Sequence, residues 1–230
     1  MRTAFCLFML ALASGCGRAP TPVTLHPADA IPERLSDWHL LAADGRRLVL
    51  NTGVMPYDLN TPLFTDYALK LRTVWMPDGT AAGYREDREL DFPVGTVLTK
   101  TFHYRYGERG FGKLDAEAKL TVDGSLSLDD HRVVETRLLV RYRDGWKALP
   151  YVWNDEHTEA WLEVAGTQHA FSLGDDEFTY LVPDMNQCSA CHAPDHSTKD
   201  IRPLGPKAHQ LNRTFSYVDG EANQLDHWAA

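Results

Sequence analysis

Between residues 71 and 182 the sequence is divided into eight short segments that are rich in β-branched and aromatic residues. Turn-forming pairs such as Asp123-Gly124 and Asp144-Gly145 separate several of these segments. Short runs of this composition, bounded by Gly, Pro, Asn and Asp, are typical of antiparallel strands joined by tight turns. The pattern predicts a mainly β protein built on an antiparallel β-sheet domain, with strands at residues 71–76, 96–106, 119–122, 133–142, 149–153, 160–164, 168–173 and 177–182.

Alternation in residues 134–142 predicts which way that strand faces. The even-numbered residues are mostly apolar, whereas Glu135, Arg137 and Arg141 occupy the other face. Because successive side chains of a strand point to opposite faces, this pattern predicts a strand with one packed face and one face in water.

Lys100 interrupts an otherwise apolar face of the segment 97–104. It shares that face with Leu98, Phe102 and Tyr104. One interpretation is an ammonium group that reaches water or protects an edge strand from pairing. The other is that Lys100 points into a ligand cavity.

Helical patterns are confined to short stretches. Pro32 precedes Leu35, Trp38 and Leu41 at helical spacing, which predicts a short helix over residues 32–41. Leu225 and Trp228 predict a last helical turn near the C-terminus.

The N-terminus has the organisation of a secretion signal. Arg2 precedes an apolar run over residues 4–13, and small residues then lead to Cys16. The run is shorter than the roughly 20 apolar residues that a membrane-spanning helix needs. We expect residues 1–15 to be removed and Cys16 to carry a lipid anchor on the periplasmic side of a bacterial envelope; an ordinary soluble export signal is the alternative. Residues 16–34 would then be a linker, residues 35–183 the β domain, and residues 184–230 a C-terminal segment.

Charge and cysteine usage narrow the class of protein further. The formal net charge of −9 disfavours nucleic acid as a partner and favours partner proteins with a basic docking surface. Of the four cysteines, Cys6 lies in the signal and Cys16 is the predicted lipidation site. Cys188 and Cys191 remain, so a disulfide-rich scaffold is excluded.

The sequence Cys188-Ser189-Ala190-Cys191-His192 has the C-x-x-C-H pattern of c-type haem attachment. On one helical turn, residues three and four apart share a face. Two thiols at this spacing can form thioethers with the two haem vinyl groups, while the adjacent imidazole reaches the iron. The motif predicts one covalent haem c, with His192 as the proximal iron ligand.

Three other interpretations of the motif remain open. Cys188, Cys191, His192 and His196 could form a zinc site with compressed spacing. A thioredoxin-like redox pair has the same C-x-x-C spacing but lacks the surrounding βαβ pattern, and a plain short-loop disulfide is the third alternative. Spacing does not select the ligand on the second face of the iron from the available side chains, which are Met55, Met76, Met185, His103, His157, His196, His209 and His227.

Five segments together resemble a family of exported bacterial c-type cytochromes, often with two haems, whose role is unknown. They are PYDLNTPLFTDYALKLR, DFPVGTVLTKTF, ETRLLVRYRDGWKALPYVWNDE, NQCSACH and LGPKAHQLNR. The five segments lie between residues 56 and 213, and the resemblance as a whole extends over residues 35–228. This chain departs from longer members in having a single C-x-x-C-H, so their second haem has no counterpart here.

A narrower similarity is to cytochrome P460 and the β-sheet cytochromes c′, which also place a C-x-x-C-H after an antiparallel β domain. Their Gly-containing strand that ends in lysine resembles residues 93–100, although Val94 stands where an acidic residue is usual. In cytochrome P460 the lysine of that strand is cross-linked to the haem. The resemblance therefore implies a P460-like β domain, with Lys100 in the haem pocket.

Two redox functions and one non-redox function follow from these observations. The first is electron transfer in the bacterial envelope, which makes the chain an electron carrier rather than an enzyme. The second is a haem protein that binds or oxidises a small nitrogen or oxygen species at an open iron position near Lys100. The third is a lipid-tethered binding module in which the C-x-x-C holds zinc or a disulfide.

Overall fold

The computed structural model describes residues 21–105, 124–173, 176–193, 195, 197, 198 and 200–229, with the backbone alone for residues 171–173 and 176. These residues are 42% strand and 10% helical, and they form several antiparallel sheets with three short α-helices. The mainly β prediction is confirmed. The predicted signal segment, Cys16, His196 and the predicted strand at 119–122 lie outside the described residues.

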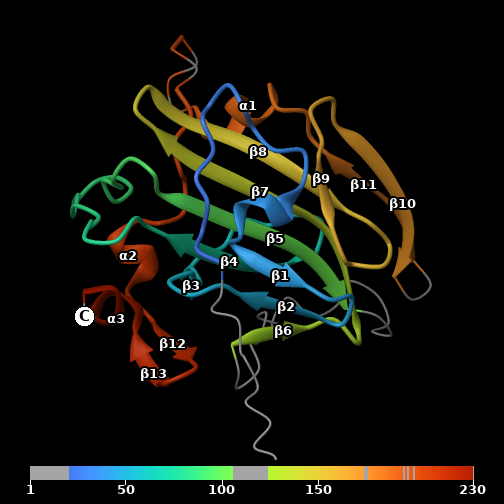
Figure 1. The fold of residues 1–230 in the computed structure, drawn as a ribbon, viewed down its shortest axis with the longest axis horizontal. Coiled ribbons are helices and arrows are strands. Elements are labelled where there is room, and N and C mark those ends of the chain that lie inside the picture. The colour runs from blue at the N-terminus through green and yellow to red at the C-terminus, as the bar shows by residue number, and fades with distance from the viewer. Residues whose placement is uncertain are drawn as a thin grey trace, which may run out of the picture.

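The largest element is a six-stranded antiparallel sheet (Figure 1). Its spatial order is β3-β4-β5-β7-β8-β9, so neighbours along the chain are neighbours in the sheet once β6 is set aside. The bounds are β3 Met55–Tyr57, β4 Leu69–Trp75, β5 Val97–Arg105, β7 His131–Tyr142, β8 Gly145–Trp153 and β9 Ala160–Leu162.

Smaller elements surround this sheet. A second sheet is formed by β1 Leu41–Ala43, β2 Arg47–Leu50 and β6 Ser125–Ser127, and two hairpins are formed by β10 Thr167–Leu173 with β11 Asp176–Val182 and by β12 Thr214–Tyr217 with β13 Gly220–Asn223. The helices are the 3-10 helix η1 Leu35–Trp38 and the α-helices α1 Cys188–His192, α2 Ala208–Leu211 and α3 Gln224–Ala229. Among the described residues, none of these helices has the length and apolar character needed to cross a membrane.

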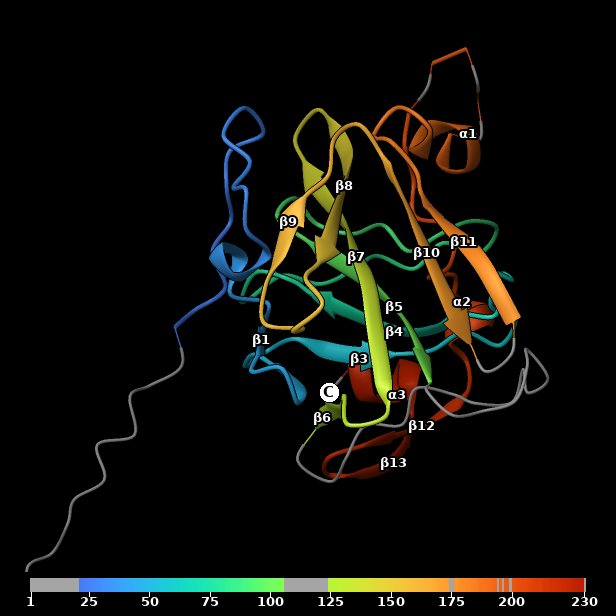
Figure 2. The same ribbon diagram turned by 90° about the vertical axis from the view of Figure 1, so that its right-hand side faces the viewer.

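The two faces of the six-stranded sheet are covered by different parts of the chain (Figure 2). The N-terminal segment with η1 and β1 lies against one face, here called the N-terminal face, and buries Trp38, Leu48, Leu138 and Leu149 in one apolar cluster. The helix α1 and the β10–β11 hairpin lie on the other side of the sheet, here called the motif face. Buried apolar side chains therefore cover both sides of the sheet, which holds it as the central layer of the fold.

The outward-facing prediction for β7 is wrong. Glu135 is fully buried and Arg137 is half-buried on the motif face, because α1 and β11 cover the sheet where water was expected. A register shift between Phe102 and His103 in the pairing of β5 with β7 also moves Val134 out of the predicted alternation. Val134 packs with Phe102 and Tyr180 instead of with Leu138.

The predicted helices and edge strand have mixed outcomes. The helix predicted over residues 32–41 is a single 3-10 turn at Leu35–Trp38, while the predicted C-terminal turn is present as α3. The edge-strand interpretation of Lys100 is wrong, because β5 lies between β4 and β7 in the sheet.

Candidate functional site

The turn before α1 is organised by Asp184. The Oδ1 atom of Asp184 accepts hydrogen bonds from the backbone N–H groups of Asn186 and Gln187 at 2.8 and 2.9 Å. An aspartate that binds the backbone two and three residues later closes an Asx turn, which favours a change of chain direction. The turn therefore connects the end of β11 to α1, the helix that carries the C-x-x-C-H motif.

The two thiols of the motif are free. Cys188 is half-buried and Cys191 is exposed, and no disulfide joins them. Burial raises the pKa of the Cys188 thiol, and the positive charge of Arg137 opposes that shift. A redox-active C-x-x-C pair needs a depressed thiol pKa, so the environment of Cys188 does not favour the thioredoxin-like interpretation.

His192 is held in one tautomer by the backbone. Its Nδ1 atom lies 2.8 Å from the carbonyl oxygen of Arg202. Since a carbonyl only accepts hydrogen bonds, Nδ1 carries the proton and Nε2 keeps its lone pair. The Arg202 N–H also donates to the carbonyl oxygen of His192 at 2.8 Å, so two hydrogen bonds fix this contact.

The environment of His192 keeps the imidazole neutral. Burial lowers its pKa, and the positive charges of Lys100 and Arg137 act in the same direction, whereas the hydrogen bond to Arg202 opposes them. A neutral imidazole with one N–H donated to the protein and a free Nε2 is the form in which histidine binds metals.

Beneath α1 the motif face of the sheet carries a group of charged residues, here called the charged row, consisting of Arg72, Lys100 and Arg137 on β4, β5 and β7. Lys100 is directly opposite Arg72 on one side and Arg137 on the other. Its ammonium lies 4.9 Å from the centroid of the Phe102 ring. Burial lowers the pKa of Lys100 to about 7, and the neighbouring cations Arg72 and Arg137 add to the shift.

Arg137 is fixed by the buried carboxylate of Glu135. Its Nε atom donates to Oε2 at 2.8 Å and its Nη2 atom donates to Oε1 at 2.5 Å. The hydroxyl of Tyr180 on β11 also donates to Oε1, at 2.5 Å. The bidentate pair and the tyrosine together satisfy a carboxylate with no exposed surface, and they tie β11 to β7 next to the motif helix.

Seven of the eight side chains named as second iron ligands lie in the described part of the chain, and the structure places them in different surroundings. Met55 and Met76 pack on the motif face, in the apolar cluster with Leu98 and Phe92. His103 pairs in register with Val133, which belongs to the apolar cluster on the N-terminal face, and Met185 packs against that same cluster.

The remaining histidines have other surroundings. His157 accepts a hydrogen bond from the backbone of Val133, His209 is exposed on α2, and His227 on α3 stacks on Tyr217 with ring centroids 3.7 Å apart. Met55 and Met76 are therefore the candidates, among those described, whose packing places them on the face that α1 covers.

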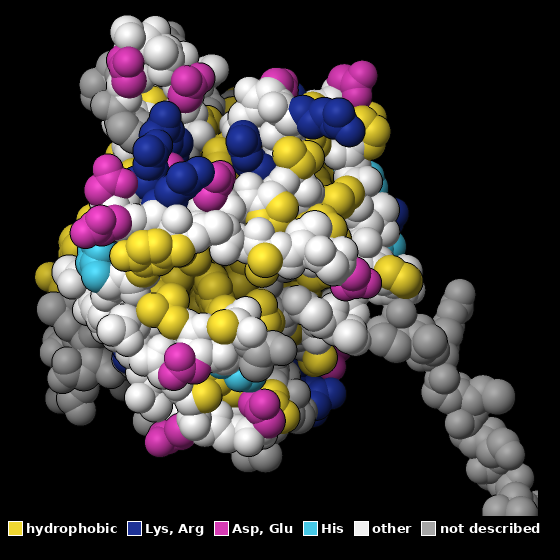
Figure 3. Space-filling model, turned by 90° about the vertical axis from the view of Figure 1, so that its left-hand side faces the viewer, with side chains coloured by type: hydrophobic (Ala, Val, Ile, Leu, Met, Phe, Trp, Pro, Cys, Tyr) yellow, Lys and Arg dark blue, Asp and Glu magenta, His cyan; other side chains and the backbone are white. Residues whose placement is uncertain are grey.

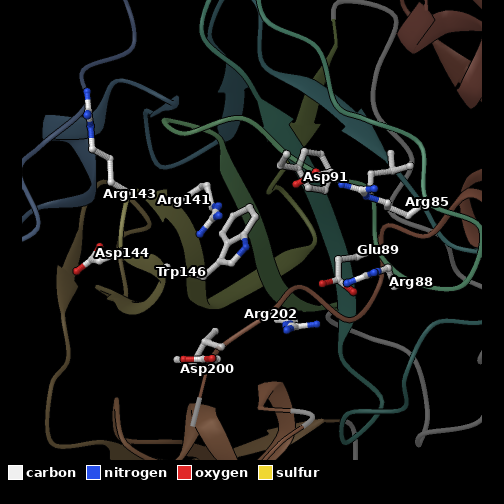
Figure 4. Close-up of a pocket in the computed structure, with 14 residues that line it drawn as sticks. Arg85, Arg88, Glu89, Asp91, Arg141, Arg143, Asp144, Trp146, Asp200 and Arg202 are labelled. Carbon is white, nitrogen blue, oxygen red and sulfur yellow. Dashed lines mark hydrogen bonds and ion pairs between the residues drawn. The ribbon is translucent and has the colours of Figure 1, made fainter. Parts of the chain in front are cut away.

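An open cavity of about 520 Å³ adjoins this site (Figure 4). We call it the arginine pocket, because five arginines line it together with Trp146: Arg85, Arg88, Arg141, Arg143 and Arg202. Arg202 is the residue whose backbone holds His192, so the pocket and the motif share one segment of chain. Its volume lies within the range of small-molecule sites, roughly 300–1,000 Å³.

Sequence reasoning found the motif but not its surroundings. Glu135, Arg137 and Tyr180 were assigned to strands, yet the buried pair and its link to the motif were missed. Arg137 follows Glu135 by two residues, which places both on one strand face, and that spacing was the available signal. Nothing in the sequence brought Arg141 and Trp146 together with residues 200–202.

Within the described residues, no cluster of three or more His, Cys, Asp or Glu side chains could hold a metal ion. The zinc interpretation needs His196, which lies outside that part of the chain. Comparisons of the chain with protein-family models, with curated proteins and with solved structures found no match in any of the three. The function is therefore inferred from the chain's own residues.

Proposed function

We propose that the protein is an exported c-type cytochrome that carries one haem, bound covalently to Cys188 and Cys191, and that it transfers electrons in the bacterial envelope. The observation that carries the proposal is the state of His192, whose Nδ1–H is donated to the Arg202 carbonyl at 2.8 Å. This leaves the Nε2 lone pair available beside two thiols that no disulfide joins, on the same helical turn. The donor set of two sulfurs and one neutral imidazole fits haem c.

The chain's own residues would have distinct tasks in such a protein. A bound haem supplies an iron that changes oxidation state by one electron. Arg202 orients His192, Glu135 and Arg137 hold β11 and the sheet together under α1, and Lys100 and Arg137 supply positive charge close to the imidazole. Because Glu135 balances Arg137, it is Lys100, protonated below about pH 7, that would favour the reduced form of a nearby redox centre.

The proposal also includes export of the protein and its attachment to a membrane. The segment 1–16 supports export and lipid attachment at Cys16, which would tether the protein to a membrane on the periplasmic side. The net charge of −9 supports partner proteins with a basic docking surface.

The experiment is an absorption spectrum of protein produced together with haem-maturation proteins. We expect a pigment that stays on the chain in acidified organic solvent and that is lost in the double variant Cys188→Ser/Cys191→Ser. The variant His209→Ala, which changes an exposed histidine on α2, is the matched control and should retain the pigment. Colourless wild-type protein, or pigment that the solvent extracts, contradicts the proposal.

A second candidate function is favoured by the position of Lys100. Its side chain lies on the motif face, and its charge acts on His192, as the P460-like interpretation requires. In that case the iron keeps an open position for a small nitrogen or oxygen ligand, and the reduced protein should be high-spin and bind CO rapidly.

Substitution of the two candidate methionines separates the functions. If Met55 or Met76 is the second ligand, the wild-type iron should be low-spin, and Met55→Leu or Met76→Leu should convert it to a high-spin form that binds CO. If the position is open, neither variant should change the spin state. Met185→Leu, on the opposite cluster, is the control for a general loss of packing.

A further inference from the structure

Apolar side chains lie beneath the arginine pocket. Leu90 and Phe92 are buried there, and the rings of Phe92 and Trp146 meet edge to face with centroids 6.0 Å apart. The guanidinium of Arg141 lies over the Trp146 ring, 5.9 Å from its centroid. Figure 4 shows Arg141 and Trp146 side by side at the centre of the pocket, with the other charged residues around them. The pocket thus presents the partly exposed ring of Trp146, supported from below by Phe92, and one cation beside it.

The positive charge of Arg141 is not balanced by a carboxylate within the described part of the chain. No carboxylate among the described residues forms an ion pair with its guanidinium, whereas Arg85 on the rim pairs with Asp91 at 2.5 Å. The backbone of Arg141 is fixed by the neighbouring residues 95 and 96, because its N–H donates to the Thr96 carbonyl at 2.9 Å and its own carbonyl accepts from the Gly95 N–H at 2.8 Å. The planar guanidinium at the end of this side chain presents a fork of donors that matches a carboxylate.

The rim carries charges of both signs and does not by itself select an anion. Its charged residues are Arg85, Arg88, Arg143 and Arg202 against Glu89, Asp91, Asp144 and Asp200, and all of them except the half-buried Glu89 are exposed. Figure 3 views the molecule from the side of α2 and shows Lys and Arg side chains gathered near Asp and Glu, above an apolar hollow. Exposed charges of this kind are screened by salt, so selectivity must come from Arg141 on the floor.

We propose that the arginine pocket binds a carboxylate carried on a flat apolar body, with the carboxylate on Arg141 and the flat body against the ring of Trp146. Two sources have this chemistry. One is the propionate edge of a haem attached at α1, which rests on the proposed function and is supported by the position of Arg202 in both sites. The other is a free aromatic acid, which does not depend on haem.

The test uses the full chain in its haem-free form, Cys188→Ser/Cys191→Ser, with benzoate as the probe and benzamide as its uncharged match. Calorimetric titration should give a dissociation constant for benzoate that is at least about tenfold lower than that for benzamide. Adding Arg141→Gln should remove this preference. Arg34→Gln, which changes an arginine paired with Asp37 beside η1, should preserve it.

The haem-loaded protein distinguishes the two sources. Benzoate binding that is absent in the haem-loaded protein but present in the haem-free chain assigns the pocket to the propionates, whereas equal binding in both forms assigns it to a free acid. The proposal is overturned by the absence of saturable benzoate binding, by equal affinity for benzamide, or by equal effects of Arg141→Gln and Arg34→Gln. A chain that never takes up haem would contradict the proposed function and leave this test intact.

Discussion

Lys100 and Arg137 lie directly opposite each other on β5 and β7, with α1 over them, and both charges lower the pKa of His192. The charge of Arg137 is balanced by Glu135, whereas Lys100 carries an unpaired charge below about pH 7, where its ammonium is protonated. That charge should raise the reduction potential of an attached haem, because it disfavours the more positive iron. Their geometry connects the sheet to the redox chemistry that we propose.

Replacing Lys100 by methionine should lower that potential. Loss of one nearby positive charge corresponds to a shift on the order of tens of millivolts at an effective dielectric constant of about 20. Lys147→Met is the matched control, since Lys147 pairs with Val140 of the opposite cluster and donates to the Ala28 carbonyl. Redox titration of both variants measures the effect, and equal shifts in the two would show that Lys100 has no special role.

Glu135→Gln should destabilise the protein strongly. Glu135 is fully buried, and its removal as an anion leaves Arg137 without a counter-ion and weakens the hydrogen bond from Tyr180. The expected loss in the free energy of unfolding is about 2–4 kcal/mol. Asp37→Asn, in the exposed pair with Arg34, should cost under about 1 kcal/mol. Urea denaturation gives both values, and similar losses would mean that the buried pair contributes no more than a surface pair.

Acid should destabilise the fold through His103. This histidine is fully buried, and neither ring nitrogen has a hydrogen-bond partner among the described residues. Burial lowers its pKa well below 6.5, and the facing groups His131, Arg105 and Lys70 add to the shift. The unfolded chain therefore binds a proton that the folded chain rejects, so this contribution is present above about pH 6.5 and is lost as the pH falls below it.

The pH effect can be assigned by substitution. His103→Leu should reduce the loss of unfolding free energy between pH 7.5 and pH 5.5, whereas His209→Leu at an exposed position should leave it unchanged. Identical pH dependence in wild type and His103→Leu would show that the acid sensitivity arises elsewhere.

Gly166 should tolerate a side chain poorly, because it precedes β10 and packs against residues 182–184, where the chain leaves β11 toward the motif. Its φ is 76°, and an added Cβ would meet the backbone N of Asp184 at 2.8 Å and the Val182 carbonyl oxygen at 2.9 Å. Gly79 has a similar φ of 72° and open space around it. Gly79→Ala should cost about 1 kcal/mol for the left-handed backbone alone, and Gly166→Ala should cost clearly more in thermal or urea unfolding. Equal costs would show that the contact with residues 182–184 relaxes freely.

The central strands were predictable because their signals are local. Alternation of side chains and turn pairs such as Asp144-Gly145 predicted β7 and β8. The prediction that one face of β7 meets water was wrong. Whether Glu135 meets water depends on where α1 and β11 return in space, and no local pattern encodes that return. Short strands such as β1–β3 and β6, with three or four residues each, give too little periodicity to be found.

In the candidate site, too, the local pattern was predictable and the long-range contacts were not. The motif at residues 188–192 could be found in the sequence because the proposed covalent attachment of haem needs a fixed spacing of cysteines and histidine in the chain. The partners that set its chemistry come from other elements, namely Arg202 after the helix, Lys100 and Arg137 on the sheet, and Tyr180 on β11. Their approach depends on tertiary packing, so sequence spacing predicted the ligands of the proposed haem, and the fold showed the surroundings of those residues.

The carbonyl that orients His192 belongs to a residue ten positions further along the chain. A polypeptide emerging amino-end first, from a ribosome or an export channel, thus presents both cysteines before the acceptor for the imidazole exists. Alignment of the ring must wait until residues 200–202 have folded against the helix. In the proposed cytochrome, the length of chain already exported when haem is attached would then decide whether His192 is correctly oriented at that moment.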